Sequence, residues 1–159
     1  MINLFVNYYT DKNAHRQKEL DFCLKKNLDN KLLNVVVIDS QNRMTYTDYF
    51  KLIKKYSADQ EDINIIANLD IFFDSSIELI NNIKHNTLFA LTRWDYKLET
   101  GESVFFDRKD SQDCWIFRGH VVDVFGDIYL GHPGCDNRIA YEFTKSNWVV
   151  SNPSLSIKS

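Results

Sequence analysis

Apolar runs alternate with segments of helical periodicity along the first 93 residues, and this alternation restricts the possible folds more than any other feature. A run such as "NVVVID" is rich in β-branched residues and does not alternate with polar ones, which is typical of a strand buried on both faces. The sequence predicts strands over residues 2–9, 34–40, 63–70 and 87–93, and helices over residues 10–30, 45–56 and 74–85. This order predicts an α/β fold with a mainly parallel central sheet and helices on both faces.

The chain is less regular from residue 95 on. It is polar and rich in turn residues up to residue 113, after which we expect a short strand over 114–119, a helix over 133–146 and a last strand that Pro153 ends. With 159 residues the chain has the length of one domain. We therefore expect a single domain over residues 1–159 with an irregular C-terminal part.

Composition argues against several classes of protein. A formal net charge of −3 disfavours a general nucleic-acid binder. No apolar run approaches the roughly 20 residues of a membrane-spanning helix, and the first residues lack the basic flank and cleavage site of a secretory signal. The cysteines Cys23, Cys114 and Cys135 show neither a CxxC spacing nor an even number, which favours free thiols in a reducing compartment. We expect a cytoplasmic protein without a membrane span that binds no nucleic acid.

Polar side chains stand at the end of every strand expected in the first 93 residues. The carboxyl ends of parallel strands meet at one edge of a sheet, and ligands bind in the crevice outside that edge. A single aspartate at a strand end is more often a turn residue, but four strand ends with matching polar groups favour a binding site. These groups are Asn7, Tyr8, Tyr9, Asp39, Asn68, Asp70, Arg93 and Asp95.

The usual phosphate-binding loops are missing. Neither GxGxxG nor GxxxxGK[ST] is present, which disfavours a dehydrogenase and a kinase. A diphosphate can instead be neutralised by Mg²⁺ or Mn²⁺ held by a carboxylate. Asp70 suits this role, and Asn68 faces the same way two residues earlier in the strand. Asp74, in contrast, is expected to cap the helix that follows, and a turn role for Asp70 remains the alternative.

The succession of these pieces resembles the GT-A glycosyltransferases, and more narrowly the small metal-dependent sugar transferases encoded by large DNA viruses, phages and some bacteria. The resemblance covers nearly the whole chain and is most specific in "SQDCWIF", "GCDNRIAYE" and "NPSLSIK". It implies a GT-A-like fold, with a nucleotide-sugar-binding half over residues 1–94 and an acceptor and catalytic half over residues 95–159. It also implies transfer of a sugar from a nucleotide-diphosphate donor, expected to be a UDP-sugar, to a carbohydrate or glycoprotein acceptor with Mn²⁺ or Mg²⁺.

The resemblance assigns donor-side roles to particular residues. The family motif DXD corresponds to "NLD" here, so Asp70 is implied as a metal ligand and Asn68 replaces the first aspartate. Tyr8 would flank the base and Asp39 would accept a bond from the base or ribose. Arg16 would face the same site, with a solvated helix charge as its alternative role. The implied donor-binding residues are Asn7, Tyr8, Tyr9, Arg16, Asp39, Asn68, Leu69, Asp70 and Arg93.

Catalytic candidates come mainly from the C-terminal half. Asp113 and Asp136 are carboxylates that could act as a base or stabilise the anomeric centre, and Asp136 is alternatively the cap of the helix behind it. Arg93 is expected to reach the diphosphate or sugar, with a surface ion pair to Asp95 as the competing role. Trp94 and Trp115 could stack on a sugar, but core packing is the commoner use of tryptophan.

Two other functions remain open at this stage. A nucleotidyltransferase also holds a metal on an α/β sheet, but the chain lacks its Gly-rich, Lys-bearing loop. A non-catalytic nucleotide-sugar or glycan-binding module derived from a transferase is favoured by Asn68, and by the absence of any histidine after His132, where many GT-A enzymes have a further metal ligand. If the chain is viral, its expected location is the host cytoplasm.

Overall fold

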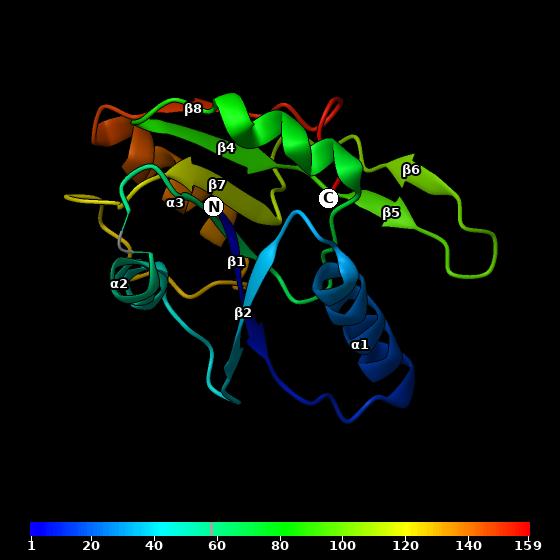
Figure 1. Ribbon diagram of the computed structural model, residues 1–159. Coiled ribbons are helices and arrows are strands. Elements are labelled where there is room, and N and C mark those ends of the chain that lie inside the picture. The colour runs from blue at the N-terminus through cyan, green and yellow to red at the C-terminus, as the bar shows by residue number, and fades with distance from the viewer. Residues whose placement is uncertain (58) are drawn as a thin grey trace.

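The computed structural model describes residues 1–57 and 59–159, which form a six-stranded sheet, a small two-stranded sheet and four helices (Figure 1). The elements in chain order are β1 (Ile2–Tyr8), α1 (Ala14–Asp29), β2 (Asn34–Asp39), α2 (Tyr46–Tyr56), β3 (Ile63–Ala67), the 3₁₀ helix η1 (Ser75–Asn82), β4 (Thr87–Leu91), β5 (Trp94–Tyr96), β6 (Ser103–Phe105), β7 (Cys114–Arg118), α3 (Cys135–Lys145) and β8 (Val149–Ser151).

The main sheet has the strand order β2-β1-β3-β7-β4-β8. β1 pairs in parallel with β2 and with β3, and β4 pairs in parallel with β8. β7 is antiparallel to both of its neighbours, β3 and β4. The mainly parallel sheet expected from the sequence is therefore confirmed. β7, which comes from the C-terminal part, lies between β3 and β4, which come from the first 93 residues.

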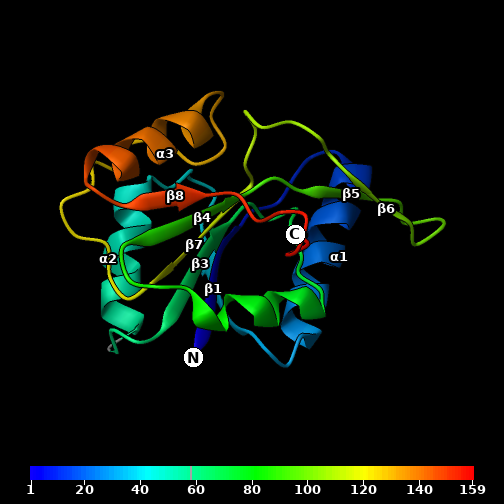
Figure 2. The ribbon, with the colours of Figure 1, turned by 90° about the horizontal axis from the view of Figure 1, so that it is seen from above.

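Helices cover both faces of the sheet (Figure 2). A separate hydrophobic core lies on each side of it. α1 and η1 pack on one face, where Leu4 of β1 and Leu20 of α1 belong to the same buried cluster. α2 and α3 pack on the other face against Phe5 and Trp115. Trp115 lies edge-on to Tyr46, with 5.0 Å between ring centroids, and is 1% exposed. It is a core residue, not a sugar-stacking one.

The helix expected over residues 74–85 is a 3₁₀ helix. Its isoleucines, Ile77, Ile80 and Ile83, recur every three residues, which keeps them on one face when the helix has three residues per turn. All three are buried under the sheet. Asp74 caps this helix as expected, since its side chain accepts a hydrogen bond from the backbone N–H of Ser76 at 2.8 Å.

The starts of α1 and α3 differ from the sequence expectation. The helix expected from residue 10 begins at Ala14, because Asn13 is its cap and the Asn13 side chain accepts hydrogen bonds from the backbone N–H groups of His15 and Arg16. The Asp11 carboxylate accepts a hydrogen bond from the Asn13 N–H. α3 begins after a left-handed Gly134, whose φ of 79° favours glycine, so that Asp136 lies in the first turn and is not the cap.

None of the helices formed by residues 1–57 and 59–159 is long and apolar enough to cross a membrane.

The β5–β6 hairpin pairs Trp94 with Phe105 and extends from the main sheet beside α1 (Figure 1).

The loop that follows β3 is held by side chains of α1. The buried Asn27 donates from Nδ2 to the carbonyl of Ile71 at 2.8 Å and accepts from the N–H of Phe73 at 3.1 Å. Asn30 donates to the Phe73 carbonyl, and the Cys23 thiol donates to the carbonyl of Asp70. A buried loop must satisfy its backbone groups, and here α1 supplies the partners. The Asp70 backbone is thereby fixed against the helix.

Substitution of Asn27 tests this loop attachment. Asn27→Ala leaves the Ile71 carbonyl and the Phe73 N–H buried without partners, so we expect the free energy of unfolding to fall by about 2–3 kcal/mol. Urea denaturation measures the change. Lys25→Ala, on an exposed position of the same helix, should change it by less than about 0.5 kcal/mol. Equal effects of the two substitutions would contradict the role of Asn27.

Candidate functional site

The reversed direction of β7 brings its start to the edge where β3 and β4 end. The backbone N–H of Asn68 donates to the carbonyl of Asp113 at 3.1 Å, and the Asp113 N–H donates to the carbonyl of Leu91 at 2.9 Å. Asp113 is therefore located beside the two strand ends that carry Asn68 and Arg93. Three residues that are far apart in the sequence meet at the carboxyl edge of the sheet, where ligands bind in such folds.

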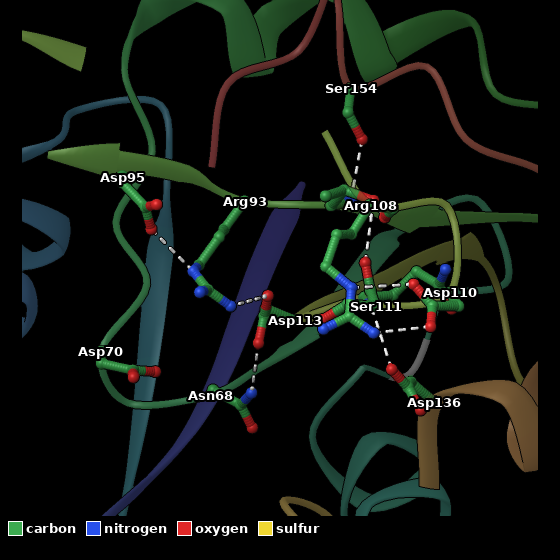
Figure 3. A network of polar contacts seen from close by, with 12 residues as sticks. Asn68, Asp70, Arg93, Asp95, Arg108, Asp110, Ser111, Asp113, Asp136 and Ser154 are labelled. Atoms are coloured by element: carbon green, nitrogen blue, oxygen red, sulfur yellow. Dashed lines mark hydrogen bonds and ion pairs between the residues drawn. The ribbon is translucent and has the colours of Figure 1, made fainter. Parts of the chain in front are cut away.

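Asp113 is the centre of a polar network (Figure 3). Its carboxylate accepts one hydrogen bond from Nδ2 of Asn68 at 3.1 Å and one from Nη1 of Arg93 at 3.3 Å. Arg93 also donates from Nε to Asp95 at 2.8 Å, and its guanidinium stacks 3.9 Å from the ring centroid of Phe106. The network fixes the Arg93 guanidinium between two carboxylates and an aromatic face.

Burial raises the pKa of Asp113, whose side chain is 15% exposed. The negative charge of Asp70 raises this pKa further, whereas Arg93 and the hydrogen bond from Asn68 lower it, and the net shift is upward. The contribution of Asp113 to stability is therefore present at low pH and is lost as the pH rises through its folded pKa.

Asp70 forms an ion pair with Arg16 of α1. Nη2 of Arg16 donates to Oδ2 of Asp70 at 2.6 Å, and Nη1 donates to Glu19 at 3.0 Å. Desolvation lowers the pKa of Arg16, but the hydrogen bonds to Asp70 and Glu19 raise it by more. The guanidinium is therefore charged and anchored to two carboxylates, and the expectation that Arg16 faces the same site as Asp70 agrees with this geometry.

A pocket of about 530 Å³ opens at the carboxyl ends of β1 and β3, and we call it the strand-end pocket. Most of the donor-binding residues expected from the sequence line it. Arg43 lines it too and closes one side by donating to the carbonyl of Gly131 at 2.6 Å. The expected residues that line it are Asn7, Tyr9, Arg16, Asn68, Leu69 and Asp70.

A second pocket of about 580 Å³ lies on the other side of the Arg16–Asp70 pair, and we call it the aromatic pocket. α1, the loop after β3 and the β5–β6 hairpin form it. Phe22 and Tyr96 stack with 5.7 Å between ring centroids, and Phe72 packs edge-on against both. Arg16 and Asp70 line both pockets, and Arg93 lines the aromatic one. The two cavities therefore adjoin at an ion pair.

Four residues expected at the site lie outside the linings of both pockets, as far as the described residues show. The Tyr8 hydroxyl donates to Asp21 of α1, and Asp39 is exposed at the end of the edge strand β2 beside Tyr8. Asp113 is located behind Asn68 and Arg93. Asp136 accepts a hydrogen bond from the backbone N–H of Gln112 at 3.1 Å and so ties the start of α3 to the segment before β7.

The donor groups at Asp70 fit a cation that prefers oxygen ligands. The negative charge of Asp70 raises the pKa of Asp113, and the Asn68 amide donates to the Asp113 carboxylate. Within residues 1–57 and 59–159, no group of three or more histidine, cysteine, aspartate or glutamate side chains is arranged to hold a metal ion. A cation at Asp70 would need phosphate oxygens and water as further ligands, and Mg²⁺ usually has such ligands.

Sequence reasoning missed Arg43 and the aromatic walls formed by Phe22, Phe72 and Tyr96. Arg43 follows the second strand end after a short loop, so the rule that ligands bind at strand ends could have included it. The aromatic residues come from three separate segments, and only the tertiary fold brings them together.

Comparisons with protein-family models, with curated proteins and with solved structures found no match for this chain.

The charge of Arg93 should control the titration of Asp113. Arg93→Gln removes a nearby positive charge that lowers the Asp113 pKa, so we expect this pKa to rise further above that of an ordinary aspartate. Carbon NMR titration of the aspartate carboxyl groups measures the shift. Arg108→Gln, which breaks an exposed ion pair with Asp110, is the matched control and should leave Asp113 unchanged. An unchanged Asp113 pKa in Arg93→Gln would contradict the proposed electrostatic contact.

Proposed function

We propose that this chain is a glycosyltransferase of the GT-A type. It moves a sugar from a nucleotide-diphosphate donor, a UDP-sugar, to a carbohydrate or glycoprotein acceptor with Mn²⁺ or Mg²⁺. The observation that carries the proposal is the junction of the two pockets at Arg16 and Asp70. A transferase has to bind two substrates on either side of one reacting centre, and a pair of adjoining pockets at the carboxyl edge of a mainly parallel sheet meets that need.

The strand-end pocket suits the nucleotide. It lies outside β1 and β3, where α/β sheets bind nucleotides, and it combines the amide of Asn7, the ring of Tyr9 and the guanidinium of Arg43. A ring beside a base and cations beside a phosphate are complementary contacts. This assignment replaces Tyr8 by Tyr9 as the aromatic residue that flanks the base.

The aromatic pocket suits the sugar side of the reaction. Trp94 and Tyr96 present apolar ring surface, and Asp95 and Arg93 present hydrogen-bonding groups at the same wall. Sugars offer both apolar C–H faces and hydroxyl groups, so a pocket of this mixed character can hold one. Asp95 is one of the carboxylates in this lining, and we assign to it the acceptance of a proton from an acceptor hydroxyl.

Asp113 and Asp136 lie outside the linings of the two pockets and hold the residues of this centre in position. Asp113 holds the Asn68 amide and the Arg93 guanidinium in place, which makes it a positioning residue. Asp136 holds the segment before β7 through the backbone of Gln112. Arg93 is the cation that reaches toward the diphosphate or the transferred sugar.

Asp70 and Asn68 are the residues that would hold the divalent cation. When bound, the cation supplies positive charge that stabilises the departing nucleoside diphosphate. Arg16 and Arg93 contribute fixed positive charge on the same side, and charge that is already in place costs no reorganisation during the reaction.

Donor turnover tests the proposed activity. Incubation with a panel of UDP- and GDP-sugars and Mn²⁺ should release the nucleoside diphosphate, and chelation of the metal should stop the release. Liquid chromatography of the nucleotides measures it. Saturable UDP binding without turnover of any donor would overturn the enzyme and leave a nucleotide-sugar-binding module. Release of pyrophosphate from nucleoside triphosphates would indicate a nucleotidyltransferase instead.

Two aspartates four residues apart provide a test of the binding site. Asp70→Ala should weaken UDP binding in the presence of Mn²⁺ at least tenfold, about 1.4 kcal/mol, because it removes the proposed metal ligand. Asp74→Ala removes the η1 cap, should destabilise the fold by about 1 kcal/mol and should leave UDP binding unchanged. Calorimetric titration and thermal melting measure the two effects. Equal UDP affinities of the two variants would contradict the assignment of Asp70.

A further inference from the structure

Arg16 and Asp70 stand where the two pockets meet, and each already has a partner of opposite charge. The bond between Nη2 of Arg16 and Oδ2 of Asp70 is 2.6 Å long, with side-chain exposures of 38% and 33%. A metal ion that binds Asp70 has to compete with this guanidinium. A phosphate that binds Arg16 has to compete with this carboxylate.

We propose that Arg16 makes the site selective for a divalent cation and a diphosphate that bind together, because it occupies Asp70 until both are present. On binding, Asp70 exchanges Arg16 for the cation and Arg16 exchanges Asp70 for a phosphate oxygen. This inference rests on the proposed function for the role of Asp70 as a metal ligand.

The electrostatics disfavour either ligand alone. A lone cation at Asp70 displaces the guanidinium and leaves two positive groups side by side, since Arg16 stays within reach. A lone diphosphate at Arg16 faces the carboxylates of Asp70 and Glu19, and all three groups are negative. When both ligands bind, every displaced charge gains an opposite one. The two binding events are therefore coupled, and a coupling free energy of this kind acts equally on both ligands.

Contacts with α1 hold both groups of the exchange at the site. Glu19, three residues after Arg16 on α1, accepts from the other terminal nitrogen of the guanidinium at 3.0 Å and keeps it in place after Asp70 leaves. The carbonyl of Asp70 accepts a hydrogen bond from the Cys23 thiol at 3.2 Å, which anchors the Asp70 backbone to the same helix.

Binding of Mn²⁺ in the absence of any nucleotide tests the exchange. Arg16→Gln should bind Mn²⁺ alone at least about fivefold more tightly than the wild-type chain, because Asp70 then has no competing guanidinium. The factor by which saturating inorganic pyrophosphate tightens Mn²⁺ binding should fall at least about fivefold. Equilibrium dialysis measures both quantities as the excess of Mn²⁺ on the protein side, which the Mn²⁺–pyrophosphate complex in solution does not produce.

Matched variants separate this effect from a general loss of positive charge. Lys18→Gln removes the same charge from an exposed position of the same helix and should behave as the wild-type chain does. Asp70→Asn in the Arg16→Gln background should abolish the gain in Mn²⁺ affinity. The inference is overturned if Arg16→Gln and Lys18→Gln bind Mn²⁺ equally, or if the gain persists in the double variant.

Pyrophosphate and UDP distinguish this inference from the proposed function, because pyrophosphate carries the charge without the nucleoside. Coupling of Mn²⁺ to pyrophosphate that Arg16→Gln weakens supports the exchange, even if UDP binds no better than pyrophosphate. Binding of UDP that is no tighter than that of pyrophosphate would overturn the nucleotide-sugar proposal and leave the exchange intact. Tight UDP binding without any coupling to Mn²⁺ would overturn the exchange and leave a nucleotide site in place.

Discussion

The antiparallel insertion of β7 between β3 and β4 is the constraint on which the rest of the site depends. A parallel strand in this place would begin at the opposite edge and carry Asp113 away from the polar strand ends. Because β7 runs the other way, Asp113 meets Asn68 and Arg93 through both backbone and side-chain hydrogen bonds. The pairing that completes the sheet also organises the charges at its edge.

Around this edge the charged groups are arranged in pairs of opposite sign. Arg16 is paired with Asp70, and Arg93 is paired with Asp113 and with Asp95. Both arginines are half-buried, where ion pairs are screened by water less than at the surface. Each arginine offsets part of the negative charge of two carboxylates, since Arg16 also pairs with Glu19. The pairs also provide acidic and basic groups that can bind a ligand with charges of both signs.

The sequence predicted the strand–helix order, the mainly parallel sheet and the Asp74 cap, because β-branched runs and capping residues act locally. It did not predict that η1 is a 3₁₀ helix, although Ile77, Ile80 and Ile83 recur at a spacing of three. The strand-end rule located most of the strand-end pocket. The aromatic pocket, and the positions of Asp113 and Asp136, depend on contacts between segments distant in the chain, which periodicity does not contain.

The place of β7 in the sheet also has a consequence for how the chain folds. β3 and β4 have no direct pairing with each other, and the strand that joins them pairs Ile63 with Arg118 across more than fifty intervening residues. During synthesis the first half of the sheet can form β1–β2 and β1–β3 pairs, but it keeps an open edge on β3 until residues 114–118 emerge. Such long-range pairing slows folding and exposes an unpaired strand in the meantime.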